Sequence, residues 1–288
     1  MKPHNLTTKI FLDSGDPQET SEALRLLGFL DGQTTNPSLV AKNPEIQKYL
    51  ASGKKLTEQE VYTRYQSIIR EISHLIPEGS VSIEVYADKI TSAEKMFVQG
   101  QEMFGWIPNA HVKYPIIQAG LAAAEMSVKA NMRVNMTLCF TEEQAAAVYA
   151  ATRGAKAGNV FISPFVGRLD DRGENGMTLI KNILKNFKTG DKHVQVLSAS
   201  VRTINHFLYS LALGADIITA PLKILVAWEK MGKPVPGKEY IYNAGSLKNI
   251  PYAGIDLNHP WTEYNYQHVL TDQGIEKFVA DWKALIDN

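Results

Sequence analysis

Lys113 is the residue of this chain whose type and setting point most directly to chemistry. It lies in the short β-type run His111–Ile116, where a buried ammonium is costly unless it meets anions or loses its proton. A neutral lysine amine in a closed site can attack a carbonyl and form a Schiff base. The alternative is that the lysine ends a strand and only reaches solvent or a carboxylate. The residues at the other strand ends decide between these interpretations.

The elements that must position Lys113 follow from the periodicity of the chain. Short β-type segments alternate with amphipathic helical segments. The pattern predicts eight strands at 9–13, 32–36, 81–86, 112–115, 134–139, 159–165, 194–200 and 217–220. It predicts helices between and after them at 17–27, 57–75, 91–104, 119–131, 141–153, 176–187, 203–213 and 222–231.

Eight strand–helix units without a long linker predict an α/β fold, a (β/α)8 TIM barrel in a single domain over residues 1–288. A doubly wound open sheet is the alternative, but it needs fewer strands and a glycine-rich first turn. Neither a G-x-G-x-x-G run nor a P-loop occurs. Residues 233–288 are rich in Pro, Gly, Asn and Tyr until a last helix at 272–286. We expect this segment to form a C-terminal arm and helix packed on the barrel.

Composition excludes several classes of function. The 30 basic and 30 acidic residues cancel, so no global field attracts nucleic acid or an anionic membrane. The single cysteine, Cys139, allows no intrachain disulfide. The polar start has no apolar signal core, and no apolar stretch approaches the ~18 residues of a spanning helix. The seven histidines are scattered without metal spacing. These features predict a cytoplasmic protein without a bound metal.

Polar side chains stand at seven of the eight predicted strand ends, and in a barrel those ends meet at one mouth. Alternation along a strand puts Asn135 and Thr137 on one face, and likewise Ser163 and Phe165. The other candidates at or just past strand ends are Asp13, Asn36, Glu84, Lys113, Arg168, Ser200 and Arg202.

Each candidate also has a structural interpretation. Asn36 before Pro37 fits a turn, and Asp13 fits a turn or helix cap. Arg168 and Arg202 could be solvated surface residues, although an anion clamp suits their position after strands six and seven. Glu84 is the hardest to explain structurally, because an unpaired carboxylate in a buried strand is disfavoured.

The strand-end residues lie in motifs that resemble those of the transaldolase family, over residues 9 to about 231. The resemblance implies the barrel fold and a Schiff-base mechanism of the class I aldolase type. Six motifs occur in the family's order, and they are Thr34–Leu39, Ser82–Val85, Val112–Lys113, Asn135–Thr137, Ser163–Arg168 and Ala199–Arg202.

The resemblance implies a role for each candidate. Lys113 would form the Schiff base with a ketose phosphate, and Asp13 would take the proton from the C4 hydroxyl. Glu84 and Thr137 would hold a water for proton transfer. The dihydroxyacetone unit would contact Asn36, Asn135 and Ser163, with Phe165 nearby, and the phosphate would contact Arg168, Ser200 and Arg202.

The implied activity is transfer of a dihydroxyacetone unit between sugar phosphates in the pentose phosphate pathway, with no cofactor. Small sugar phosphates would be the partners, and a homodimer is expected by analogy with longer relatives. Burial favours the neutral amine of Lys113, whereas Asp13 and Glu84 favour its charged form, so the sequence leaves its protonation open.

Two alternative functions stay open. A fructose-6-phosphate aldolase-type lyase would release free dihydroxyacetone, but those aldolases carry Tyr where this chain has Phe165 and Gln where it has Glu84. A non-catalytic phosphosugar-binding barrel would keep the arginines without needing Lys113, Glu84 and Asp13 together. The chain departs from the family at Gln33, Tyr114, Ile117 and Val201, which leaves the preferred sugar open.

Overall fold

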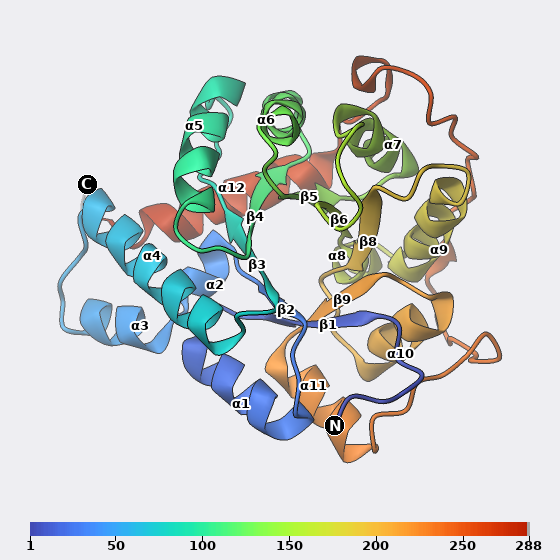
Figure 1. Cartoon of the computed structure of the whole chain (residues 1–288), viewed down its shortest axis with the longest axis horizontal. Coiled ribbons are helices and arrows are strands. Elements are labelled where there is room, and N and C mark those ends of the chain that lie inside the picture. The colour runs from blue at the N-terminus through green and yellow to red at the C-terminus, as the bar shows by residue number, and fades with distance from the viewer. Residues whose placement is uncertain (287–288) are drawn as a thin grey trace.

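A closed barrel of parallel strands organises the chain in the computed structural model, which describes residues 1–286 (Figure 1). Hydrogen-bonded neighbours follow the order β1-β2-β3-β4-β5-β6-β8-β9, and β9 pairs with β1 to close the ring. The (β/α)8 prediction is therefore confirmed. The strands are β1 Lys9–Asp13, β2 Gly32–Thr34, β3 Ser80–Glu84, β4 Ala110–Pro115, β5 Val134–Cys139, β6 Val160–Pro164, β8 Val194–Ser198 and β9 Ile217–Ala220.

Helices surround the barrel and bury one face against it (Figure 1). In α4, a capping box between Thr57 and Glu60 starts the helix, and buried Tyr65 and Ile72 face inward. The outer helices are α1 Pro17–Leu27, α4 Glu58–Leu75, α5 Ala93–Phe104, α6 Gln118–Lys129, α7 Glu142–Ala151, α9 Gly176–Phe187, α10 Ile204–Leu213 and α11 Leu222–Lys230.

Several short elements were not predicted. Pro37–Ala41 and Pro44–Ala51 form helices α2 and α3, each started by an asparagine cap before a proline. Val166–Asp170 forms α8 directly after β6. Two-residue strands β7, Glu174–Asn175, and β10, Lys248–Asn249, pair outside the barrel.

The barrel interior is apolar at one level and polar at the next. Phe11, Phe161, Leu197 and Ile217 are fully buried and pack together inside the ring. The residue two positions further along each strand is Asp13, Ser163, Ala199 or Thr219, and alternation points it the same way. The apolar layer, to which Ala199 also belongs, therefore closes the floor beneath the polar side chains of Asp13, Ser163 and Thr219.

Gly32 gives Phe11 the room it occupies in that floor. A Cβ at position 32 would come within 2.5 Å of both the Phe11 ring and the Ser80 carbonyl oxygen. We expect Gly32→Ala to lower the free energy of unfolding by about 1–3 kcal/mol, because the backbone carbonyl cannot move aside. Denaturant titration would measure this. Gly105→Ala, where the added Cβ meets nothing closer than 3.4 Å, should change stability little, and equal losses would contradict the explanation.

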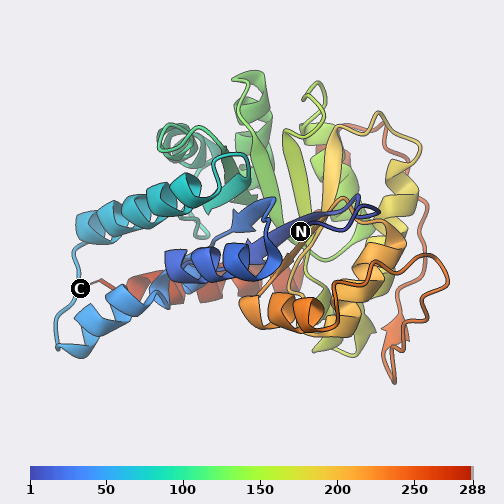
Figure 2. The same cartoon turned by 60° about the horizontal axis from the view of Figure 1, so that its bottom comes forward.

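The C-terminal segment runs along the outer helices, and its last helix lies at the mouth of the barrel. The arm is fixed to the outer helices: Trp261, in the short 3₁₀ turn Trp261–Glu263, donates to Glu125 of α6 at 3.0 Å. The last helix, α12, covers Val269–Lys283 instead of the expected 272–286. It contacts α2 and β5, and Figures 1 and 2 both show it beside α2. Residues 287 and 288 of the predicted C-terminal segment lie outside the described residues.

Strand ends differ from prediction where a helix or turn begins early. The second strand stops at Thr34 instead of Asn36, because Asn36 caps α2. The seventh predicted strand stops at Ser198 instead of Ser200, whose φ of 56° lies in the left-handed region. Within residues 1–286, no helix has both the length and the hydropathy needed to cross a membrane.

Candidate active site

A cavity of about 280 Å³ opens at the carboxyl ends of the barrel strands. Strand residues reach it from below, and α2, α8 and α12 supply its rim. The structure brings seven of the sequence-predicted residues to this one cavity, namely Asp13, Asn36, Lys113, Ser163, Phe165, Arg168 and Ser200.

Lys113 reaches the cavity from the middle of the barrel. Its side chain is 4% exposed, and its Nζ lies 2.9 Å from Glu84 Oε2 on the neighbouring strand. The ammonium also donates to the Thr35 carbonyl oxygen at 3.3 Å. The contact with Glu84 is close enough for strong charge attraction but is not aligned as a hydrogen bond. Lys113 is therefore held in place while its amine still faces the cavity.

Glu84 is a buried carboxylate with an unusual proton affinity. Burial raises its pKa, the positive charge of Lys113 opposes that rise, and the nearby Asp13 adds to it. The Tyr65 hydroxyl accepts from the Glu84 backbone amide at 3.0 Å and fixes that strand end. A carboxyl group poised this way can exchange a proton with a group bound at Lys113.

Asp13, at the end of β1, lines the same cavity as Lys113. Burial raises its pKa, although the Thr34 hydroxyl and the charge of Lys113 both lower it. Thr34 donates to Asp13 Oδ1 at 2.7 Å, and its oxygen lies 2.6 Å from the Thr219 hydroxyl. Because Thr34 gives its proton to Asp13, Thr219 must donate to Thr34. One oxygen of Asp13 is thus fixed by a hydroxyl chain, which orients the carboxylate.

An amide–hydroxyl chain orders the β5 and β6 side of the site. Ser163 donates to Asn135 Oδ1 at 2.7 Å, and Asn135 donates from Nδ2 to Ser82 at 3.0 Å. Thr137 lies two residues beyond Asn135 on the same face. Its buried hydroxyl has no hydrogen-bond partner among the described residues, which is the kind of group that a ligand or water satisfies.

Local backbone structure and packing orient three further side chains of the cavity, those of Asn36, Phe165 and Ser200. Asn36 accepts from the Leu39 amide at 2.9 Å, so its Oδ1 caps α2 while the side chain borders the cavity. Phe165 is half-buried, and its ring packs edge-on against Phe140. The left-handed backbone of Ser200 places that residue on the rim, and such conformations cluster at functional sites.

The two predicted anion-binding arginines are placed differently. Arg168 lies on α8 and lines the cavity. Arg202 does not line it; its guanidinium makes a two-pronged contact with Asp171, with one bond of 2.7 Å. Asp171 immediately follows α8 and meets Arg202 as an exposed pair. The predicted clamp is therefore assembled only in part.

Eight residues that line the cavity were not among the site residues predicted from the sequence. Thr219 could have been found, because alternation from buried Ile217 puts it on the inner face. Long-range packing brings the C-terminal side chains there, which no local pattern signals. The residues without a predicted role are Thr34, Ser38, Leu39, Lys42, Ala199, Thr219, Lys277 and Phe278, of which Thr34, Ser38, Leu39 and Ala199 lie within the family motifs.

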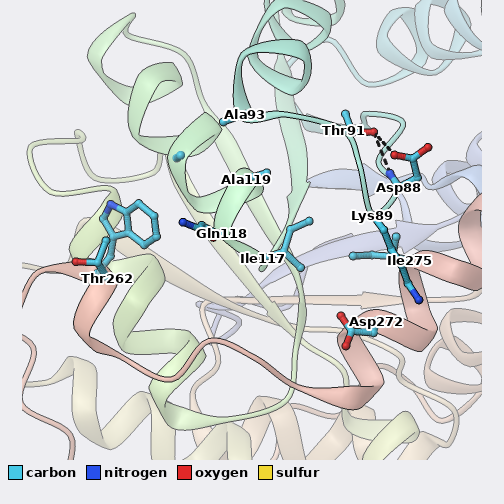
Figure 3. A pocket seen from close by; sticks show the side chains of 12 residues that line it. Asp88, Lys89, Thr91, Ala93, Ile117, Gln118, Ala119, Thr262, Asp272 and Ile275 are labelled. Carbon is cyan, nitrogen blue, oxygen red and sulfur yellow. Dashed lines mark hydrogen bonds between the residues drawn. The ribbon is translucent and has the colours of Figure 1, made fainter.

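A larger hollow of about 760 Å³ lies outside the mouth (Figure 3). It is bounded by the loop after β3, the start of α6 and the C-terminal segment, with Trp261 and Ile275 among its walls. Its ionisable side chains, such as Lys89 and Asp272, are exposed or half-exposed. It contains none of the strand-end groups, so we assign the chemistry to the smaller cavity over Lys113.

Comparison with known proteins decides the family. Residues 10–288 match the profile described as transaldolase/fructose-6-phosphate aldolase. The chain belongs to this family. The resemblance inferred from the six motifs is therefore confirmed, and a transaldolase-type enzyme is the function that the family supports.

Proteins named as probable transaldolases are similar over almost the whole chain. One from Dehalococcoides mccartyi is 35% identical over 277 residues, covering 96% of this chain and 99% of that protein. One from Paracoccus denitrificans is 35% identical over 274 residues, covering 95% and 96%. One from Cereibacter sphaeroides is 36% identical over 274 residues, covering 95% of each.

Proposed function

We propose that this protein is a transaldolase that carries a dihydroxyacetone unit on Lys113. The donor is a ketose phosphate, sedoheptulose 7-phosphate or fructose 6-phosphate. The acceptor is an aldose phosphate, glyceraldehyde 3-phosphate or erythrose 4-phosphate. The observation that carries the proposal is the buried amine of Lys113 beside Glu84, with Asp13 in the same cavity.

Schiff-base formation needs one neutral amine and a route for protons. Transfer of the Lys113 proton to a basic neighbour frees the amine, which attacks the C2 carbonyl carbon to give a carbinolamine. That intermediate loses its hydroxyl as water when the oxygen is protonated, leaving a protonated imine. Glu84 has a raised pKa and lies within proton-transfer distance of Lys113. Thr137, with its unpartnered hydroxyl, would hold a water that relays the proton.

Carbon–carbon cleavage follows from the imine and Asp13. The Asp13 carboxylate takes the proton of the C4 hydroxyl, the C3–C4 bond breaks, and its electron pair moves toward the imine nitrogen to form an enamine. The aldose leaves with C4 as its new aldehyde carbon. Attack of the enamine on an acceptor aldehyde reverses these steps, and Asp13 returns the proton. A raised pKa suits Asp13 for both taking and giving it.

Binding groups surround these reacting atoms. Asn36, Asn135 and Ser163 would hydrogen-bond the hydroxyls of the three-carbon unit, and the Ser163–Asn135 bond keeps their orientation fixed. Arg168 and Ser200 would hold the phosphate at the rim. Arg202 can join them only by leaving Asp171.

An aldolase that releases dihydroxyacetone is the alternative, and Phe165 favours the transferase. Release requires protonation of the enamine carbon, and a phenylalanine has no hydroxyl to activate a water for that step. We expect Phe165→Tyr to raise the ratio of cleavage to transfer by about tenfold or more. Assays of free dihydroxyacetone and of acceptor consumption would give the ratio. An unchanged ratio would count against the role assigned to Phe165.

Transfer is tested by supplying fructose 6-phosphate with and without erythrose 4-phosphate. A transaldolase forms sedoheptulose 7-phosphate and glyceraldehyde 3-phosphate together and releases little dihydroxyacetone alone. Release of dihydroxyacetone at the same rate without acceptor would support the lyase. Neither product, with binding retained, would support a phosphosugar-binding barrel.

The cellular setting remains part of the proposal. We place the enzyme in the pentose phosphate pathway of the cytoplasm, as a homodimer, on the analogy with longer relatives. Light scattering of the purified protein would give the mass of the assembly.

A further inference from the structure

Lys277 brings a positive charge to the cavity from a part of the chain far from the barrel strands. It lies in the middle of α12 and lines the cavity together with Phe278. The floor comes from strand residues such as Lys113, whereas α2, α8 and α12 build the rim. A ketose whose carbonyl meets Lys113 must therefore place its far end near Arg168 and Lys277.

The rim needs a second cation for that far end. A phosphate monoester carries about 1.5 to 2 negative charges near pH 7. Arg168 supplies one positive charge, but Arg202 is engaged with Asp171 and stands outside the lining. A cavity of about 280 Å³ is small enough for long side chains on several walls to reach one anion. Lys277 is placed to supply further positive charge there, and Lys42, just after α2, is the other lysine that lines the cavity.

Lys277 makes an exposed ion pair with Asp281 that a bound phosphate can replace. Its Nζ lies 3.2 Å from Asp281 Oδ2, one helical turn along α12, and the lysine side chain is 50% exposed. Exposed ion pairs of this spacing are weak. Asp281 also accepts a hydrogen bond from Ser38 at the start of α2, so it keeps a partner when Lys277 turns to a ligand.

We propose that Lys277 is a phosphate-binding residue, carried on the helix that covers the mouth, and that it gives preference for phosphorylated over unphosphorylated sugars. The proposal rests on the proposed function for its substrate and extends the phosphate site beyond Arg168 and Ser200. It also gives α12 a direct part in substrate selection, because the phosphate would bridge that helix and the barrel.

Matched variants on α12 test the proposal. Lys277→Met removes the charge and keeps the aliphatic stem, Lys277→Arg restores a charge, and Lys283→Met is the control at an exposed position that does not line the cavity. Each is assayed with fructose 6-phosphate and with unphosphorylated fructose as donor. The rise in thermal midpoint caused by inorganic phosphate is measured separately and needs no turnover.

We expect Lys277→Met to raise KM for fructose 6-phosphate by about tenfold or more, the loss of one charge-assisted hydrogen bond, with kcat nearly unchanged. Rates with fructose should not change, and the rise in thermal midpoint caused by phosphate should shrink. Lys277→Arg should recover most of the KM for fructose 6-phosphate and most of the phosphate-induced rise in thermal midpoint. If Lys277→Met behaves like Lys283→Met, the proposal is overturned. If the wild type neither transfers nor cleaves, the proposed function fails. The phosphate-induced rise in thermal midpoint then tests Lys277 by itself: a smaller rise in Lys277→Met supports the proposal, and an unchanged rise overturns it.

Discussion

Lys113→Met should abolish both transfer and cleavage, lowering kcat by about 10³-fold or more. Methionine fills a similar volume but has no amine to attack the ketose. In the wild type, Lys113 Nζ lies 2.9 Å from Glu84 Oε2. The substitution leaves the buried Glu84 carboxyl without this cationic partner. Because burial already raises the pKa of Glu84, we expect that carboxyl to become protonated and the fold to survive. Initial rates with fructose 6-phosphate and erythrose 4-phosphate measure the loss.

Two companion variants separate chemistry from folding. Glu84→Gln keeps the amine and should retain measurable adduct formation, whereas Lys113→Met/Glu84→Gln removes both charges and should be folded but inactive. Circular dichroism and thermal midpoints verify the fold. Activity of Lys113→Met within tenfold of the wild type would contradict the assignment.

Asp13→Asn should stop the reaction after the sugar has become bound to Lys113. Without a base for the C4 hydroxyl, we expect kcat to fall by about 10²–10⁴-fold. The amine, Glu84 and Thr137 remain, so the Schiff base still forms. Borohydride reduction should then trap the intact ketose phosphate in this variant and the three-carbon unit in the wild type. Mass spectrometry distinguishes the two, and a three-carbon adduct in Asp13→Asn would exclude Asp13 as the base for cleavage.

The same substitution should stabilise the protein at neutral pH. Burial raises the pKa of Asp13 in the folded state, so folding favours the protonated acid. The stabilisation that comes from protonated Asp13 is fully present below the pKa of an unfolded aspartate, about 3.9. It is lost as pH rises through the higher pKa of Asp13 in the folded protein. Asparagine has no charge to bury and can still accept from Thr34. The thermal midpoint of Asp13→Asn relative to wild type should therefore rise between about pH 4 and pH 8. A difference that stays constant over this range would contradict the burial of a charged Asp13.

Local patterns predicted the barrel well because each strand and helix obeys its own period. The Lys9–Asp13, Val134–Cys139 and Ile217–Ala220 strands begin and end where alternation and flanking turn residues place them. The short helix α2 was missed because Asn36-Pro37 was interpreted as a turn, although the asparagine side chain there caps a helix. The helix α3, capped by Asn43, was not predicted either. A helix of one or two turns has too few residues to show a period.

The cavity floor was predictable because the carboxyl ends of parallel strands must meet. The rim depends on packing between distant segments. Nothing near Lys277 in the sequence shows that α12 returns to the mouth, and nothing near Arg202 shows that Asp171 will engage its side chain. Exposed charges choose among several partners of similar energy, so the sequence alone does not fix their positions.

The central claim is that Lys113 covalently holds the donor sugar. The direct measurement is borohydride reduction of the wild-type protein with fructose 6-phosphate, followed by proteolysis and mass mapping of modified lysines. We predict one reduced three-carbon adduct, on Lys113, that is lost when an acceptor aldose phosphate is added first. No adduct, or an adduct on another lysine, would contradict the mechanism.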